Sequence, residues 1–150
     1  QAYNNVIYGN NGGMHVAYGG SSGNKIFNNT IFGNKGSDGY CIILLYTVSD
    51  ILQNNICWEN GGDSQDNGIG PHSSSNLTTN PLFVNYAGLD FHLREGSSAI
   101  DAGSVVIGVS DDADGNPRPQ GSGYDIGAYE FSGNPVDNVP PAPPVDVTIN

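Results

Sequence analysis

Four basic side chains are the chain's candidates for a catalytic base: Lys25, Lys35, Arg94 and Arg118. Lyase chemistry on an acidic sugar needs such a base beside groups that neutralise the substrate carboxylate. Lys25 lies in a predicted strand, but the position 26 residues later is Ile51, so no basic column forms. We therefore predict no lyase site within this chain.

The acidic side chains offer a second chemistry, hydrolysis by two carboxylates roughly 5–9.5 Å apart. Five of them cluster at two predicted corners: Asp38, Asp50, Glu59, Asp63 and Asp66. Nothing in their spacing selects a pair. We therefore predict no catalytic residue in this stretch; an active form of the protein would be a polysaccharide lyase or a glycoside hydrolase.

Residues 111–116 (DDADGN) place hard oxygen ligands close together and form the candidate calcium loop. The loop lacks the downstream Glu of an EF-hand and no flanking helices are predicted, which favours a solvated turn. We predict no required cofactor, with calcium as the metal that this loop would take. His15 and Cys41 are expected to stack on an outer face, but two ligands do not make a zinc site.

Arg118 is close in sequence to Asp125 and Glu130. This spacing predicts a partly buried ion pair that fixes the C-terminal region, in preference to substrate binding.

Three aromatic residues recur at one position of three near-identical segments: Tyr8, Phe32 and Trp58. In strands stacked about 4.8 Å apart, their rings would form an outward column that binds polysaccharide or another protein. The alternative is that the non-repeating C-terminal region covers them.

The elements that would position these rings are repeats beginning at residues 4, 28 and 54: NNVIYGN, NNTIFGN and NNICWEN. Repeats of about 25 residues are typical of stacked architectures. Each reads as three short strands, around residues 14–18, 25–27 and 30–32 in one copy. Turn signals every 8–12 residues also suit an antiparallel sandwich, but the recurrence of whole 26-residue blocks favours one coil of a parallel β-helix per repeat.

Alternation within the strands assigns the inward side chains. The predicted inward columns are Ile7–Ile31–Cys57, Ala2–Ile26–Leu52 and Val16–Ile42. The paired Asn residues should stack as a ladder whose amides bond backbone groups of the turn. A disulfide between Cys41 and Cys57 is not favoured, because the overlay puts the two at different positions of consecutive repeats.

The charge and hydropathy of the chain disfavour some classes of binding partner. The chain has 15 Asp and Glu against 4 Lys and Arg, a formal net charge of −11, which disfavours nucleic acid and anionic lipid surfaces. No apolar run approaches the roughly 20 residues of a membrane span. Without an initiator Met or a signal peptide, the chain reads as a processed product or an excised piece.

Two regions follow from these patterns. Residues 1–131 form a domain of about three coils with an irregular cap over the last one, and residues 132–150 form an extended Pro-rich tail. Residues 145–149 alternate like a strand. Adding that strand to an unpaired sheet edge of a neighbour would build a head-to-tail filament.

The C-terminal motifs carry a family resemblance: NPLF (80–83), GSSAIDAG (96–103), DGNPRP (114–119) and DIGAYEF (125–131). With the repeats, they resemble the C-terminal end of the right-handed parallel β-helix superfamily typified by pectate-lyase-like proteins. The resemblance implies an all-β fold in a secreted bacterial or archaeal protein. It implies activity only weakly, because this superfamily also includes adhesins and surface proteins.

Three functions are thus expected. The first is an extracellular or cell-surface module that binds, displays or supports and is related to carbohydrate-active proteins. The second is the C-terminal part of a polysaccharide lyase or glycoside hydrolase whose active site lies on coils outside this chain. The third is a subunit of the head-to-tail filament described above.

Overall fold

The computed structural model describes residues 1–17, 22–66 and 74–133. The described part is all β apart from one short 3-10 helix, and its strands fall into three repeats and a hairpin. Repeat 1 contains β1 (Ala2–Tyr3), β2 (Val6–Tyr8) and β3 (Gly12–Ala17); repeat 2 contains β4 (Lys25–Phe27), β5 (Thr30–Phe32) and β6 (Asp38–Leu45); repeat 3 contains β7 (Ile51–Gln53), β8 (Ile56–Trp58) and β9 (Gly62–Asp66). The hairpin contains β10 (Phe83–Asn85), η1 (Tyr86–Gly88) and β11 (Asp90–Leu93).

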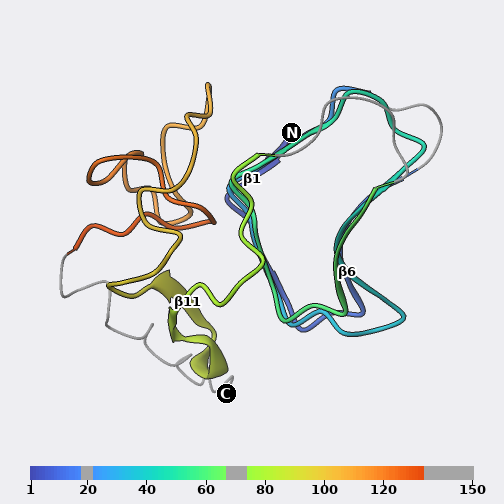
Figure 1. The fold of residues 1–150 in the computed structure, drawn as a ribbon, viewed down its shortest axis with the longest axis horizontal. Helices are drawn as coiled ribbons and strands as arrows, with labels where there is room; N and C mark the ends of the chain where they lie inside the picture. The colour runs from blue at the N-terminus through green and yellow to red at the C-terminus, as the bar shows by residue number, and fades with distance from the viewer. Residues whose placement is uncertain (18–21, 67–73, 134–150) are drawn as a thin grey trace, which may run out of the picture.

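Equivalent strands of the three repeats pair in parallel. The sheets are β1-β4-β7, β2-β5-β8 and β3-β6-β9, and in Figure 1 the three repeats lie over one another. In the second sheet Ile7 pairs with Ile31 and Ile31 with Cys57. In the first sheet Ala2, Ile26 and Leu52 are in register. Both predicted columns are confirmed, and the arrangement is that of a short β-helix-like stack.

The third sheet departs from the predicted register. Gly12 pairs with Asp38, but Met14 already pairs with Ile42, so two extra residues of β6 are absorbed between these pairs. A bulge of this kind shifts every later partner. Val16 consequently lies over Leu44, not over Ile42 as predicted.

The interior between the three sheets is a small aliphatic core. Its buried members are Ile26, Ile31, Cys41, Ile42, Leu44, Leu52 and Cys57. Isolated parallel bridges add a partial fourth level, because Ser74 pairs with Gln53 and Leu77 with Ile56. The fold therefore extends slightly beyond the three predicted repeats.

Residues 78–131, the C-terminal cap, do not lie over the last repeat as predicted. They run along the flank of all three repeats, on the side of β1 and away from β6 (Figure 1). The cap buries Phe27 against Val106 and Val109. A larger cluster joins Ile56 of the repeats to the cap's Phe83, Phe91, Leu93, Ala99 and Ile126. The reason is that the outward faces of the first two sheets carry large apolar side chains, which the cap removes from water.

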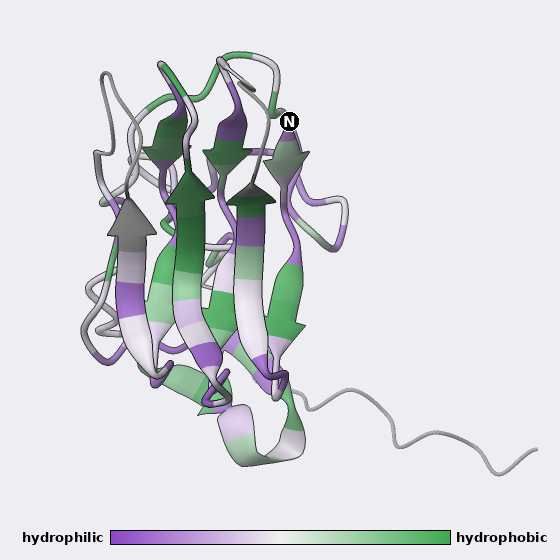
Figure 2. Cartoon of the chain, turned by 90° about the vertical axis from the view of Figure 1, so that its right-hand side faces the viewer, coloured by the Kyte–Doolittle hydropathy of each residue, from purple (hydrophilic) through white to green (hydrophobic). Residues whose placement is uncertain are grey.

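The third sheet, β3-β6-β9, lies on the side opposite the cap (Figures 1 and 2). Within the described residues, no helix is long and apolar enough to cross a membrane. The predicted tail strand at 145–149 lies outside the described residues, so the filament that it would build stays a prediction.

Candidate functional site

The Asn-Asn corner between the first and second sheets makes hydrogen bonds both between repeats and to the cap. The first residue of each pair, Asn4, Asn28 or Asn54, has a left-handed backbone with φ of 55°, 50° and 58°. Asn tolerates this region better than most residues. The two members of each pair then have different partners, one inside the stack and one in the cap.

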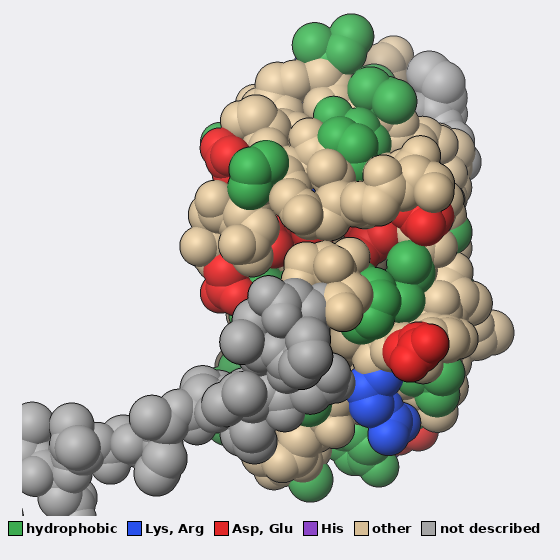
Figure 3. Space-filling model, turned by 90° about the vertical axis from the view of Figure 1, so that its left-hand side faces the viewer, with side chains coloured by type: hydrophobic (Ala, Val, Ile, Leu, Met, Phe, Trp, Pro, Cys, Tyr) green, Lys and Arg blue, Asp and Glu red, His purple; other side chains and the backbone are tan. Residues whose placement is uncertain are grey.

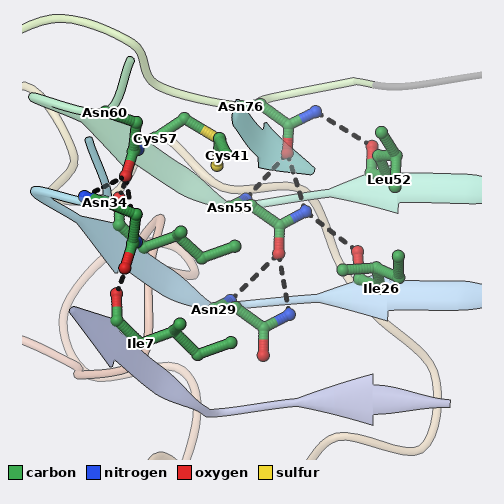
Figure 4. Close-up of a disulfide and its surroundings, with 11 residues drawn as sticks. Ile7, Ile26, Asn29, Asn34, Cys41, Leu52, Asn55, Cys57, Asn60 and Asn76 are labelled. Carbon is green, nitrogen blue, oxygen red and sulfur yellow. Dashed lines mark hydrogen bonds between the residues drawn. A yellow bond between two sulfur atoms is a disulfide. The ribbon is translucent and has the colours of Figure 1, made fainter. Parts of the chain in front are cut away.

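The second members form the predicted ladder (Figure 4). The Oδ1 atom of Asn29 accepts hydrogen bonds from the backbone N–H and the Nδ2 of Asn5, and Asn55 Oδ1 accepts the same two from Asn29. Asn76 continues the ladder beyond Asn55, because its Oδ1 accepts from the backbone N–H and the Nδ2 of Asn55 (Figure 4). A second, parallel ladder joins Asn10, Asn34 and Asn60. The ladder prediction is confirmed, with Asn76 as a rung that it did not include.

The first members of the pairs attach the cap. Asn4 donates to the Asp111 carbonyl, and Asn28 donates to the Asp125 carbonyl. Asn54 both donates to the Ser104 carbonyl and accepts from the Ser104 N–H, at 2.7 and 2.9 Å. Each repeat thus has its own polar anchor to the cap.

Gly127 lets the cap approach the second sheet closely. A Cβ built there would lie 2.5 Å from Ile56 Cδ1 and 3.0 Å from Thr30 Oγ1, and its φ of +103° is itself unfavourable for other residues. At this point Gly127 N–H donates to the Asn54 carbonyl and Ala128 N–H to Thr30 Oγ1. The DIGAYEF motif therefore serves as a docking segment.

The two cysteines form a disulfide, which corrects the prediction. Cys41 and Cys57 have a Cα–Cα distance of 5.5 Å, and both side chains belong to the core (Figure 4). The predicted outer-face stack of His15 on Cys41 is wrong as well, because His15 pairs with Ile43. The bulge in β6 explains both errors, since Cys41 lies where the regular register is interrupted.

Loss of this disulfide should lower the free energy of unfolding by about 3 kcal/mol, the value for a loop of about 15 residues. The test is the double variant Cys41→Ala/Cys57→Ala, compared with the native chain by urea unfolding with and without a reductant. The reductant should destabilise only the native chain. An equal response of both chains would contradict the prediction.

The aromatic column is in register but largely covered. Tyr8 pairs with Phe32, and Phe32 with Trp58. The ring of Phe32 lies 5.4 Å from Trp58 and 5.4 Å from the cap residue Phe91. Tyr86 of the cap packs on both Phe32 and Trp58, at 5.6 and 5.4 Å. The C-terminal region therefore covers Phe32 and Trp58, as in the alternative considered above. Tyr8 is less covered, with 40% of its surface exposed.

Arg118 makes the predicted ion pair. The side chains of Arg118 and Glu130 are fully buried. Arg118 Nη1 lies 2.5 Å from Glu130 Oε1. Arg118 also donates to the carbonyl of Gly127 and to Asn4 Oδ1, which links the cap to repeat 1. Burial raises the pKa of Asp125 to about 7, although the N–H groups of Asp101 and Phe131 bond its carboxylate and act in the opposite direction.

The candidate calcium loop is a turn held by its own carboxylate. Asp112 is buried, and its Oδ1 accepts from the N–H groups of Asp114 and Asn116. Its Oδ2 accepts from the Glu130 N–H. Among the described residues, no group of three or more His, Cys, Asp or Glu side chains is arranged to hold a metal ion.

His92 lies between two carboxylates, a site that the sequence analysis missed. Its Nδ1 is 2.6 Å from Asp90 and its Nε2 is 2.8 Å from Asp114, while its ring stacks on Tyr129 at 4.1 Å. Burial lowers the pKa of His92, but the hydrogen bonds to Asp114 and Asp90 outweigh it and raise the pKa above 6.5. Burial also raises the pKa of Tyr129 to about 12. We call Asp90, His92 and Asp114 the histidine clamp.

The histidine clamp should make stability depend on pH. Since the pKa of His92 is higher in the folded chain, the stability that it adds is fully present below about 6.5 and is lost as the pH rises through the folded value. Urea unfolding of the native chain and of His92→Gln should therefore differ most at pH 5.5 and least at pH 8.5. The variant Asp114→Asn, which removes the exposed carboxylate, should show a smaller pH effect; a constant difference between native and His92→Gln would refute the clamp.

The remaining chemical candidates are scattered. Asp50 is buried and accepts from Asn24, while Glu59 pairs with Lys35 on the surface at 2.7 Å. Asp38 and Asp63 are exposed. The partners recorded for these acidic side chains are thus Asn24 for Asp50 and Lys35 for Glu59.

The comparisons with known proteins give no relative. No protein-family model matches the chain, no curated protein matches it, and no solved structure matches it.

Proposed function

We propose that this chain is a structural and display module of a secreted or cell-surface protein. In this proposal the stacked repeats are a right-handed parallel β-helix of the pectate-lyase-like kind that the sequence resembles, and the cap is its side-docked C-terminal end. The module holds surfaces in place and does not catalyse a reaction within this stretch.

The observation that carries this proposal is the buried disulfide in the repeat core. Structural disulfides form and persist mainly in oxidising compartments, such as the cell exterior. The cluster between the three sheets has seven buried apolar residues among those that the structure describes, and a core of this size gains from a covalent link. The acidic side chains across the outer face of the cap (Figure 3) suit a soluble surface more than a nucleic-acid partner.

The display role is supported by how the cap is tied down. Each repeat has an Asn anchor to the cap, and the buried Arg118–Glu130 pair connects the cap to Asn4 of repeat 1. Such over-determined packing rigidifies a scaffold.

The test is the redox state and location of the native protein. Cells that make it are fractionated, free thiols are alkylated before lysis, and the Cys41 and Cys57 peptides are identified by mass spectrometry. The proposal expects the protein in the medium or surface fraction with both cysteines disulfide-linked. A cytoplasmic protein with alkylated thiols would overturn it.

A second candidate, glycan binding, rests on the two tyrosines at the edge of the aromatic cluster. Tyr8 and Tyr86 are 40% and 48% exposed. Tyr8 contacts the buried ring of Phe91, and Tyr86 contacts the partly buried ring of Phe32. Sugar rings stack on such surfaces. Binding to a polysaccharide array that Tyr8→Ala abolishes, and Tyr46→Ala leaves unchanged, would support this function; the absence of binding to neutral and acidic glycans would exclude it. Tyr46 is the matched control because it is 70% exposed and has no ring contact in the described structure.

A further inference from the structure

Asp125 lies where the docking segment, residues 125–131, meets repeat 2. Its carbonyl accepts a hydrogen bond from Asn28 Nδ2 at 3.1 Å. The next two residues of the segment donate their backbone N–H groups to the carbonyls of Ala99 and Asn54. Asp125 itself is 0% exposed. An ionised carboxylate at this joint is therefore out of contact with water while the cap is docked.

The joint holds two buried acids and one buried cation. Asp125 and Glu130 are 0% and 3% exposed, and the Asp125 N–H donates to Glu130 Oε1 at 2.9 Å, which keeps the two residues together. In the described structure Arg118 pairs with Glu130 and bonds Asp125 only at its backbone carbonyl. The Asp125 carboxylate accepts from the N–H groups of Asp101 and Phe131, which are neutral donors. A buried charge without a counterion destabilises the fold.

The other groups around Asp125 add no positive charge. Asp101, whose N–H bonds Asp125, brings a third carboxylate to the site. The repeats contribute neutral groups to this part of the docking segment: the amide of Asn28, the carbonyl of Asn54 and the hydroxyl of Thr30.

The first Asn of repeat 2 shows a deficit of donors at the same joint. Asn4 Oδ1 accepts from Arg118, and Asn54 Oδ1 accepts from a backbone N–H. Asn28 Oδ1 is buried and has no hydrogen-bond partner among the described residues. A protonated Asp125 carries an O–H donor, which the carboxylate lacks, in the residue that Asn28 already contacts. Charge and hydrogen bonding thus both favour a proton here.

We propose that the joint formed by Asp125, Glu130 and Arg118 is a pH-sensitive switch, which holds the docking segment on the repeats in acid and loosens it as the pH rises through neutrality. Undocking returns Asp125 to water, where its carboxylate ionises. The inference goes beyond the proposed function, because it concerns how firmly the cap is held and not what the module displays.

The direction of the pH effect follows from burial. Burial raises the pKa of Asp125 from 3.8 to about 7, and the charges of Glu130 and Asp101 act in the same direction. Between these two pH values the docked segment binds a proton that the undocked segment releases. The equilibrium constant for undocking therefore rises by up to about tenfold for each pH unit in this window and levels off above it.

Undocking would uncover part of the aromatic cluster. Tyr129 and Phe131 of the docking segment are partly buried side chains that pack against the cluster containing Phe32 and Trp58. The switch thus sets how much of this apolar face meets solvent at a given pH.

The experiment measures both the proton and the undocking on the full chain. Carbon-13 NMR of labelled Asp and Glu carboxyl groups gives the titration midpoint of Asp125. Hydrogen exchange at the Gly127 and Ala128 amides, corrected for the intrinsic pH dependence of exchange, gives the undocking constant, because these amides bond repeats 3 and 2. Three variants accompany the native chain: Asp125→Asn, which is neutral at every pH; His92→Gln, which removes the histidine clamp; and Asp38→Asn, an exposed control.

The proposal expects Asp125 to titrate near pH 7 in the native chain. The undocking constant should increase by at least about tenfold from pH 5.5 to pH 8.5 in the native chain, His92→Gln and Asp38→Asn, and by less than about threefold in Asp125→Asn. A midpoint of Asp125 at or below its ordinary 3.8, or an undocking constant of the native chain that does not change with pH, would overturn the proposal. The carboxyl titration is read on the native chain, so it decides even where Asp125→Asn does not fold.

Discussion

Replacing Arg118 by Met should lower the free energy of unfolding by about 3–5 kcal/mol, the usual cost of removing one partner of a buried ion pair. The cost arises because Glu130 would remain as a buried charge without its counterion. The bonds from Arg118 to Gly127 and Asn4, which join the cap to itself and to repeat 1, would be lost too. Urea unfolding followed by Trp58 fluorescence measures the change, because this side chain packs against the cap.

The matched control is the surface pair of Lys35 and Glu59, whose side chains are 59% and 48% exposed. Lys35→Met should change stability by about 1 kcal/mol or less, as for other exposed pairs. If Arg118→Met were equally mild, the buried pair would not fix the cap. A second variant, Glu130→Gln, removes the charge and keeps the acceptor; combined with Arg118→Met, it should recover part of the loss.

Asn55→Ala is the second large effect, with an expected loss of about 3–5 kcal/mol. Asn55 is fully buried and accepts from Asn29 while donating to the Ile26 carbonyl. Truncation to Ala leaves the Asn29 N–H and the Ile26 carbonyl buried without a hydrogen-bond partner. Each unsatisfied group lowers the free energy of unfolding by about 1–3 kcal/mol.

Position in the ladder supplies the control for this prediction. Asn5 is exposed, so water replaces its partners, and Asn5→Ala should cost about 1 kcal/mol. Chemical denaturation of both variants at one pH gives the comparison. Equal losses at Asn5 and Asn55 would mean that the ladder does not stabilise the stack through its buried rungs.

The repeat region could be predicted because its signal is periodic. Asn-Asn pairs 24 and 26 residues apart fix which strands pair, and alternation then fixes the inward columns. This reasoning located Ile7, Ile31 and Cys57 correctly. It failed where the period breaks: the extra residues of β6 moved Val16 onto Leu44 and placed Cys41 in reach of Cys57.

The cap could not be derived in the same way, since non-repeating segments carry no register. Its polar residues predicted the Arg118–Glu130 pair from proximity in sequence. The histidine clamp escaped because His92 and Asp114 are 22 residues apart and meet only through the tertiary fold. The one local signal was Asp90, two residues before His92. In a strand, side chains two residues apart lie on the same face and can contact each other. Asn76 had a signal as well, since Asn76-Leu77 matches Asn55-Ile56.

The central claim is that like side chains stack on like in the repeats. Methyl–methyl nuclear Overhauser effects in a chain with labelled Ile and Leu residues measure this most directly. The account predicts a strong contact between Ile7 and Ile31 and another between Ile26 and Leu52, the pairs that share a register across adjacent parallel strands. Contacts of Ile7 with Leu52 or Ile56 in place of Ile31 would contradict it.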